Sequence, residues 1–311
     1  MDPMTRLAAS LLYLLAAGVA RLPWSWLQAL ADGVAWCWRR IDARESRVAR
    51  RNLALAMPWA DPRNREALQQ RVLRTTARQA LETLVFWTRR HRRNLPLIRE
   101  QHGVELFEAA IAAGRGVIVA APHYGNWELL SQWLASRTRL AILYRPPESA
   151  VGEAFLQRVR AGDGDRVRQV PAEGAAVRQL LRILQDGGVV GILPDQQPKA
   201  GEGVFAPFFG MQALTMRLLP RLAARTGATV LFAYCERIGS RGSAPAFALR
   251  IEAAPDGIAS EDPVEGATAL NAAVEAIARR QPEQYQWTYK RYTLRPPESG
   301  ETNPYRDLER H

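Results

Sequence analysis

A histidine and a glutamate five residues apart are the side chains of this sequence best suited to proton transfer. His123 and Glu128 belong to the segment His-Tyr-Gly-Asn-Trp-Glu, which follows the apolar run 116–122. The run is typical of a buried strand and residues 129–134 of a helix, so a tight turn through Gly125 can fold the two side chains together. If Glu128 accepts a hydrogen bond from one imidazole nitrogen, the other nitrogen is free to take a proton from a substrate hydroxyl. The spacing predicts general-base chemistry without a protein nucleophile.

A structural interpretation of the same pair is also open. His123 can be a buried histidine near a helix start, and Glu128 a first-turn carboxylate that the helix dipole favours. The choice depends on further segments that accompany the pair in a fixed order along the chain. They are residues 47–53, 80–84, 143–147, 193–197, 203–210, 213–215, 282–287 and 290–291.

Together with the signature at 121–128, these segments resemble the lysophospholipid acyltransferase superfamily and, within it, the lipid A biosynthesis acyltransferases. The resemblance covers residues 40–292. It implies transfer of a fatty acyl chain from an acyl-carrier-protein or coenzyme A thioester to a hydroxyl of a lipid A precursor, with neither cofactor nor metal. Gln197 stands where some lipid A acyltransferases carry an acidic residue, so the reaction class carries over more securely than the acceptor. A lysophospholipid, ornithine lipid or pigment-type acceptor is the alternative.

The same resemblance assigns a binding role to Arg145, which is expected to hold an anionic group of the donor or acceptor. We also expect Asn126, Asp195 and Gln196 to bind substrate. His123, Arg145 and Asp195 each follow a predicted strand, and ligands of α/β proteins gather at the carboxyl ends of strands. The three side chains are therefore expected to face one cleft, whether or not the resemblance holds.

Alternating strands and helices predict an α/β layered fold with a central, mostly parallel sheet flanked by helices. The expected strands are residues 116–121, 139–144, 188–193, 228–235 and 246–252. The expected helices are residues 64–89, 104–113, 126–136, 174–186, 212–226 and 264–280.

Charge and composition favour an anionic partner. The net charge is +11, and Lys199 and Lys290 are the only lysines among 42 basic residues. Arginine is well suited to forked contacts with phosphate. Nucleic acid and anionic lipid both fit this charge, so a membrane-tethered nucleic-acid or regulatory binding protein is the non-enzymatic alternative.

The amino terminus favours lipid, and we expect no nucleic-acid partner. Residues 7–20 form an uncharged run of 14 residues, which as a helix rises about 21 Å, less than the roughly 30 Å of a bilayer core. We expect residues 1–40 to be a membrane anchor, spanning or interfacial, and residues 41–311 the catalytic domain.

A signal peptide with small residues at 16–18 is the competing interpretation. Six arginines within 39–51 favour an anionic membrane surface on the cytoplasmic face of a Gram-negative inner membrane.

The two cysteines carry no predicted chemistry. Cys37 and Cys235 are far apart in the sequence, and neither has metal-ligand spacing around it. We expect neither a disulfide nor a metal site, and both residues are expected to be free thiols.

Overall fold

A central sheet organises the chain in the computed structural model, which describes residues 3–144, 146–147, 149–160, 166–172, 176–241, 244–297 and 299–309. Within these residues the sheet has seven strands in the order β1-β9-β8-β2-β5-β3-β4. Their bounds are β1 Ile98–His102, β2 Val117–Ala120, β3 Leu140–Tyr144, β4 Val167–Pro171, β5 Val189–Ile192, β8 Thr229–Arg241 and β9 Ala244–Ala253. All neighbouring strands are parallel except β8 and β9. The expected α/β fold with a mostly parallel sheet is confirmed.

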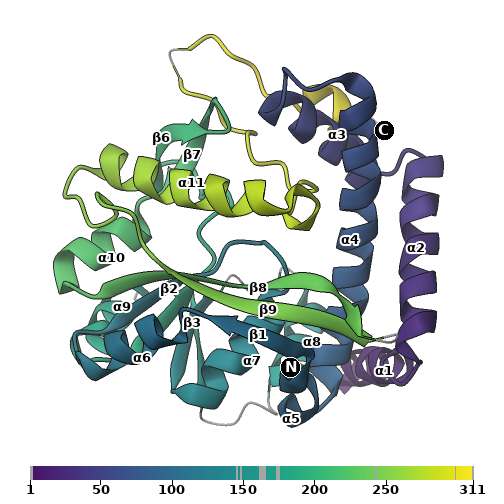
Figure 1. The fold of residues 1–311 in the computed structure, drawn as a ribbon, viewed down its shortest axis with the longest axis horizontal. Helices are drawn as coiled ribbons and strands as arrows, with labels where there is room; N and C mark the ends of the chain where they lie inside the picture. The colour runs from purple at the N-terminus through teal and green to yellow at the C-terminus, as the bar shows by residue number, and fades with distance from the viewer. Residues whose placement is uncertain are drawn as a thin grey trace.

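Helices cover both faces of this sheet (Figure 1). On one side lie α9 Ala176–Gln185, α10 Leu218–Thr226, α11 Pro263–Arg280 and the hairpin of β6 Gly203–Phe208 and β7 Met211–Met216. On the other side lie α6 Val104–Ala112, α7 Trp127–Arg137 and α8 Ala150–Arg160. The remaining helices are α1 Pro3–Val19, α2 Trp24–Arg40, α3 Arg44–Ala56, α4 Pro62–Thr88, α5 His91–Asn94 and the short 3-10 segments Leu95–Leu97, Pro282–Gln284 and Arg306–Glu309.

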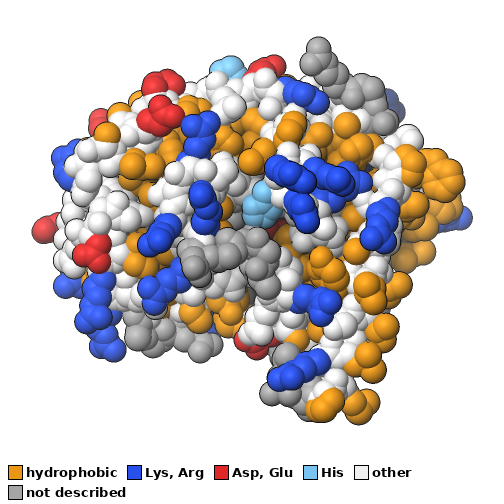
Figure 2. Space-filling view, turned by 90° about the horizontal axis from the view of Figure 1, so that it is seen from below, with side chains coloured by type: hydrophobic (Ala, Val, Ile, Leu, Met, Phe, Trp, Pro, Cys, Tyr) orange, Lys and Arg blue, Asp and Glu red, His pale blue; other side chains and the backbone are white. Residues whose placement is uncertain are grey.

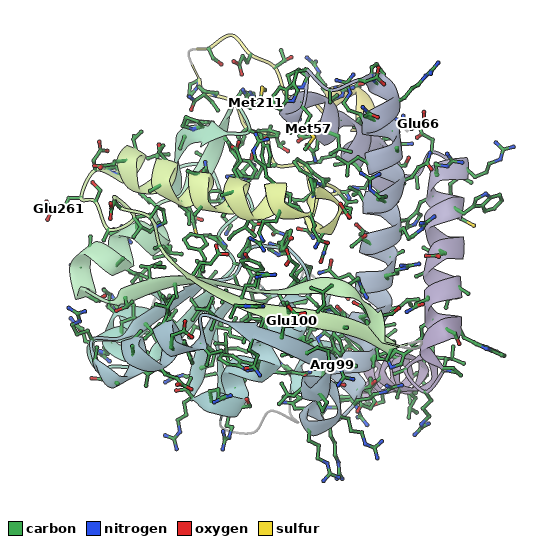
Figure 3. All side chains as sticks on the ribbon, in the orientation of Figure 1. Met57, Glu66, Arg99, Glu100, Met211 and Glu261 are labelled. Carbon is green, nitrogen blue, oxygen red and sulfur yellow. The ribbon has the colours of Figure 1, made fainter. Side chains whose placement is uncertain are left out.

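The central strands are apolar because both of their faces are buried. All four residues of β2 and all four of β5 are buried, and parallel strands covered on both faces read as continuous apolar runs. Side chains fill the space between the sheet and α11, and Met57 and Met211 pack against the edge of this core (Figure 3). The five strands expected from the sequence are all present.

The chain differs from the prediction where a helix was expected over 212–226. Residues 211–216 instead form β7, which pairs with β6 in an antiparallel hairpin, and α10 begins only at Leu218. Phe209 and Gly210 form the two-residue turn with φ of 48° and 75°, as in the primed turns that suit hairpins. Phenylalanine rarely adopts such a φ, and for this reason the turn left no signal in the sequence.

Buried polar side chains hold this hairpin against α11. Asn271 donates to the carbonyl of Pro207 over 3.0 Å and to Thr215 Oγ1 over 2.8 Å. Arg291, only 4% exposed, donates to the carbonyl of Leu214 and to Thr215 Oγ1. The carboxy-terminal segment therefore fixes the hairpin in place.

The amino-terminal helices α1 and α2 extend beside α4 and α8 (Figure 1). In the described part of the chain no single helix is both long and apolar enough to cross a bilayer. α1 and α2 meet the length and composition criteria only as a pair, and they are bent by 112° at the break between them. Division of the chain at residue 40 stays a prediction.

Candidate active site

His123 and Asp195 form a buried hydrogen-bonded pair at the carboxyl edge of the sheet. The imidazole Nδ1 lies 2.8 Å from Asp195 Oδ1, and the backbone N–H of His123 donates to Asp195 Oδ2 over 2.9 Å. Their side chains are only 10% and 3% exposed. Because a carboxylate only accepts, Nδ1 carries the hydrogen and the lone pair of Nε2 is left to act as a base.

The sheet brings the two residues together. β2 and β5 are parallel neighbours, and Ala120 is paired with Ile192. His123 and Asp195 each come three residues after their member of that pair. The sequence carried this signal as two similar segments, Gly-Val-Ile-Val-Ala-Ala-Pro-His and Gly-Val-Val-Gly-Ile-Leu-Pro-Asp, which begin at residues 116 and 188.

The orienting carboxylate therefore differs from the one expected. The sequence predicted that Glu128 accepts the hydrogen bond from the imidazole. In the structure, the partner of His123 Nδ1 is Asp195. Glu128 lies in the first turn of α7, beyond the turn that His123 begins, whereas Asp195 leaves the adjacent strand. Glu128 does line the same cavity as His123, and its catalytic role stays a prediction.

Two further side chains contact the imidazole. Gln196 Nε2 lies 3.2 Å from His123 Nε2 and donates to Gln286 Oε1 over 3.1 Å. The Trp127 ring packs edge-on against the imidazole at 4.8 Å between centroids. The amide of Gln196 thus lies beside the nitrogen that a substrate hydroxyl would approach.

Gly125 allows the turn after His123 to pack closely against β8. Its φ is +60°, and a Cβ at this position would lie 2.1 Å from the carbonyl oxygen of Cys235. The backbone N–H of Gly125 donates to the carbonyl of Gln284, and that of Asn126 to the carbonyl of Cys235. The amides of Gly125 and Asn126 are therefore engaged with protein acceptors.

Asn126 has a structural place in the turn. Its Oδ1 caps α7 by accepting from the N–H of Leu129 over 3.1 Å, and its Nδ2 lies 3.3 Å from Glu82 Oε2. Glu82 also forms an ion pair with Arg237. Asn126 is 1% exposed and is not among the described residues that line the cavity, which differs from the expected substrate contact.

A cavity of about 650 Å³ opens beside this pair. His123, Glu128 and Gln196 line it, whereas Asp195 lies behind the imidazole. Arg145 lies outside the described residues. Of the five residues expected to act with His123, Glu128 and Gln196 line the cavity. The other walls of the cavity were not indicated by the sequence.

The walls divide into a charged part and an apolar part. Arg217 and Arg221 line the cavity at the start of α10, and Lys199 and Glu202 line it from the segment between β5 and β6. The apolar walls come from the sheet and from α7 and α8, and they include Val119, Leu130, Leu134, Leu140, Ile142, Val159 and Val167.

Burial and the interactions with His123 shift the pKa of Asp195 in opposite directions. Burial alone would raise its pKa, but the charge of His123 and the hydrogen bonds from His123 outweigh this, and the pKa lies below its usual value. Tyr285 has a raised pKa because it is buried and because Asp195 carries negative charge nearby. Burial also raises the pKa of the Cys235 thiol, which disfavours the thiolate that a nucleophile needs. Because its pKa is lowered, Asp195 is the ionised member of the pair.

Comparisons with known proteins show which family the chain resembles. Residues 3–293 match the family model described as bacterial lipid A biosynthesis acyltransferase. The chain is 25% identical over 303 residues to the lipid A biosynthesis palmitoleoyltransferase of Escherichia coli (strain K12), covering 91% of this chain and 95% of that protein. It is 23% identical over 282 residues to the lauroyltransferase of the same strain, covering 89% of each. A phosphatidylinositol mannoside acyltransferase of Mycobacterium tuberculosis (strain CDC 1551 / Oshkosh) is 28% identical over 136 residues, 43% of this chain and 42% of that protein.

Asp195→Asn is expected to lower turnover by about 10²–10⁴ while the protein stays folded. The carboxylate accepts from two donors, His123 Nδ1 and the His123 backbone. An amide offers one acceptor and one donor, so it favours the tautomer with the proton on Nε2, which cannot act as a base. Initial rates of Asp195→Asn and Glu128→Gln test this. Near-normal turnover in Asp195→Asn with a large loss in Glu128→Gln would mean that Glu128, and not Asp195, orients the imidazole of His123.

Gly125→Ala is expected to destabilise the protein more than Gly114→Ala. Both glycines have left-handed backbones, with φ of +60° and +67°, but nothing lies within 4 Å of a Cβ at Gly114. Gly114→Ala should cost only the strain of about 1–2 kcal/mol, and Gly125→Ala adds the collision with the Cys235 carbonyl. Thermal unfolding of the two variants measures the difference. Equal shifts would contradict the close approach of the turn to β8.

Proposed function

The chain belongs to the bacterial lipid A biosynthesis acyltransferase family and is an acyltransferase, and we propose that it moves a fatty acyl chain from an acyl thioester to a hydroxyl of a lipid A precursor. The observation that carries this proposal is the His123–Asp195 pair, which faces a cavity with cationic and apolar walls. Family membership favours the enzymatic interpretation over the alternative of a nucleic-acid or regulatory binding protein.

His123 acts as the general base in the proposed reaction. The acceptor hydroxyl replaces the amide of Gln196 as the partner of Nε2 and gives its proton to that nitrogen. The alkoxide oxygen forms a bond to the thioester carbonyl carbon, and the carbon–sulfur bond then breaks. The departing sulfur takes the proton from the imidazolium, which returns His123 to its starting state. Asp195 stabilises the imidazolium between these two steps.

Gln196 is the side chain best placed to stabilise the tetrahedral oxyanion. Its amide nitrogen lies 3.2 Å from the Nε2 of His123, so it can donate to an oxygen that develops negative charge beside the reacting hydroxyl. Glu128 is retained as the second catalytic candidate, because it lines the cavity from the first turn of α7.

The cationic wall suits the phosphate groups of the proposed substrates. Lys199, Arg217 and Arg221 line the cavity. A lipid A precursor carries phosphates on its sugar, and phosphopantetheine carries one at the end of its arm opposite the thioester. Arginine binds phosphate with forked hydrogen bonds. Arg145 is proposed to bind the same class of anion. An acyl-carrier-protein thioester and a coenzyme A thioester both satisfy this chemistry.

A different lipid acceptor is the second candidate. The similarity to a phosphatidylinositol mannoside acyltransferase favours it specifically, because that protein is named for a different lipid acceptor. A lysophospholipid, an ornithine lipid or a pigment-type acceptor would use the same base and the same phosphate or carboxylate contacts.

We further propose that α1 and α2 attach the enzyme to the cytoplasmic face of the inner membrane. On α1 the large apolar side chains are strongly exposed, at 61% for Leu7, 62% for Leu14 and 68% for Leu15. Hydrophobic side chains gather along one edge of the molecule, and Lys and Arg side chains lie next to that edge (Figure 2). An apolar helix face beside basic residues is typical of a segment in an anionic membrane interface.

Lipid mass spectrometry tests the proposed reaction. In a host that lacks its own late lipid A acylation, the wild-type protein should add one acyl chain to lipid A, and His123→Ala should add none because the base is gone. If another lipid gains an acyl chain in a His123-dependent manner, the second acceptor class is correct. If His123→Ala retains turnover, the mechanism is wrong.

Leu14→Asp combined with Leu15→Asp should release the protein from lipid vesicles. Two charges on the exposed face of α1 would oppose insertion into the acyl region, because burying a charge there is costly. Flotation with vesicles containing anionic lipid measures the effect. Leu106→Asp combined with Val264→Asp serves as the control, since these exposed apolar residues lie on α6 and α11. Unchanged flotation of the α1 variant would contradict attachment through this face.

A further inference from the structure

The apolar part of the cavity has a floor made by three neighbouring strands. Gly191 in β5 is paired with Val119 in β2 and with Ile142 in β3, and all three residues line the cavity. They form one row across the same face of the sheet. His123 and Asp195 follow the ends of the same two strands, β2 and β5, and each comes four residues after its member of this row.

Gly191 is unusual at the centre of this row. β5 is buried along its whole length, and a glycine inside a strand costs about 0.5–1 kcal/mol relative to alanine. Two structural reasons commonly account for such a glycine, namely a left-handed backbone or a close approach of another chain segment. Neither of them applies to Gly191.

The surroundings of Gly191 would accept a side chain. Its φ is not in the left-handed region. A Cβ there would lie 3.7 Å from Ile142 Cγ1, 3.7 Å from Leu140 Cδ1 and 3.9 Å from the Ala141 carbonyl oxygen, which are ordinary van der Waals distances. A side chain at this position would instead fill cavity volume. The glycine therefore preserves open space rather than backbone geometry.

The position of Gly191 relative to His123 defines which part of a bound chain would pass it. Four residues of parallel strand span about 13 Å. An extended hydrocarbon with C–C bonds of about 1.5 Å advances roughly 1.3 Å per carbon, so about ten carbons cover this distance. The cavity continues past Gly191 to Leu140 and Val167, which are paired across β3 and β4.

We propose that Gly191 determines the acyl chain length that the enzyme accepts. The inference rests on the proposed function, in which the thioester carbonyl lies beside His123 and the acyl tail runs along the sheet. Gly191 leaves the cavity open at about the tenth carbon, so that a longer tail can pass over β5 toward Leu140 and Val167. A larger residue at this position closes that path.

Gly191→Val tests the proposal with the purified full-length protein. Donors are acyl thioesters of graded length, on acyl-carrier protein and on coenzyme A in parallel, with a lipid A precursor as acceptor. For chains of about fourteen carbons or more, kcat/KM should fall roughly 10–200-fold, as expected when a methylene-sized group must be excluded from an apolar pocket. For chains of about ten carbons or fewer, the change should stay within about threefold, because such chains end before Gly191. Gly191→Ala should give a smaller shift in the same direction.

Val190→Ile is the matched control. Val190 is the neighbouring residue of β5, and it packs with Ile118 and Ile192 in the core on the opposite face of the sheet. This substitution adds volume to the same strand without entering the cavity, so the order of preference among chain lengths should be that of the wild type.

The outcomes separate this inference from the proposed function. If the wild type transfers no chain from either donor, the proposed function fails and the inference fails with it. If the wild type is active and Gly191→Val lowers kcat/KM equally for short and long chains, or for none, the chain-length role of Gly191 is wrong while the function stands. If Gly191→Val does not fold by circular dichroism, the ratio of long-chain to short-chain turnover in Gly191→Ala decides, and an unchanged ratio overturns the inference.

Discussion

The parallel pairing of β2 with β5 is the constraint on which the site depends. Both strands are four residues long and buried on both faces, and a slip of one residue would exchange the faces on which their side chains lie. Such a slip would also separate His123 from Asp195, because each stands three residues beyond the pair Ala120 and Ile192. Backbone hydrogen bonds of the sheet therefore hold the imidazole opposite its carboxylate. Proton transfer needs that degree of positioning, and a rigid strand supplies it better than a mobile loop.

The region behind the turn contains three buried carboxylates, and their partners separate their roles. Glu82 pairs with Arg237, and Glu236 accepts from Tyr124, Arg250 and Arg280. Asp195 instead has His123 as its charged partner. A carboxylate held by guanidinium groups stays ionised and structural, since arginine does not release its proton. The carboxylate paired with a histidine is the one whose partner changes charge during proton transfer.

Much of the architecture followed from apolar runs, but the contacts of the site did not. The runs at 117–120 and 189–192 identify two strands without revealing that they are neighbours, since 72 residues separate His123 from Asp195. Sequence proximity favoured Glu128 as the partner, whereas sheet order selected Asp195. The edge strand β1 is mostly exposed and the edge strand β4 has a single fully buried residue, so both lack the continuous apolar pattern by which the central strands are recognised. The hairpin of β6 and β7 was missed because Phe209 carries the positive φ of its turn.

The arrangement of the cavity fixes the direction in which an amphipathic substrate must lie. The cavity is lined by the cationic side chains Lys199, Arg217 and Arg221, and by apolar side chains of the sheet, α7 and α8. A polar head group is solvated best beside the cations, and an acyl tail loses least free energy against the apolar wall. His123 lines the same cavity as both of these parts. α8 contributes Val159 to the cavity and packs its Phe155 in the same cluster as Ala9 and Ala16 of α1. Val159 therefore connects the apolar wall of the cavity to the hydrophobic cluster at α1.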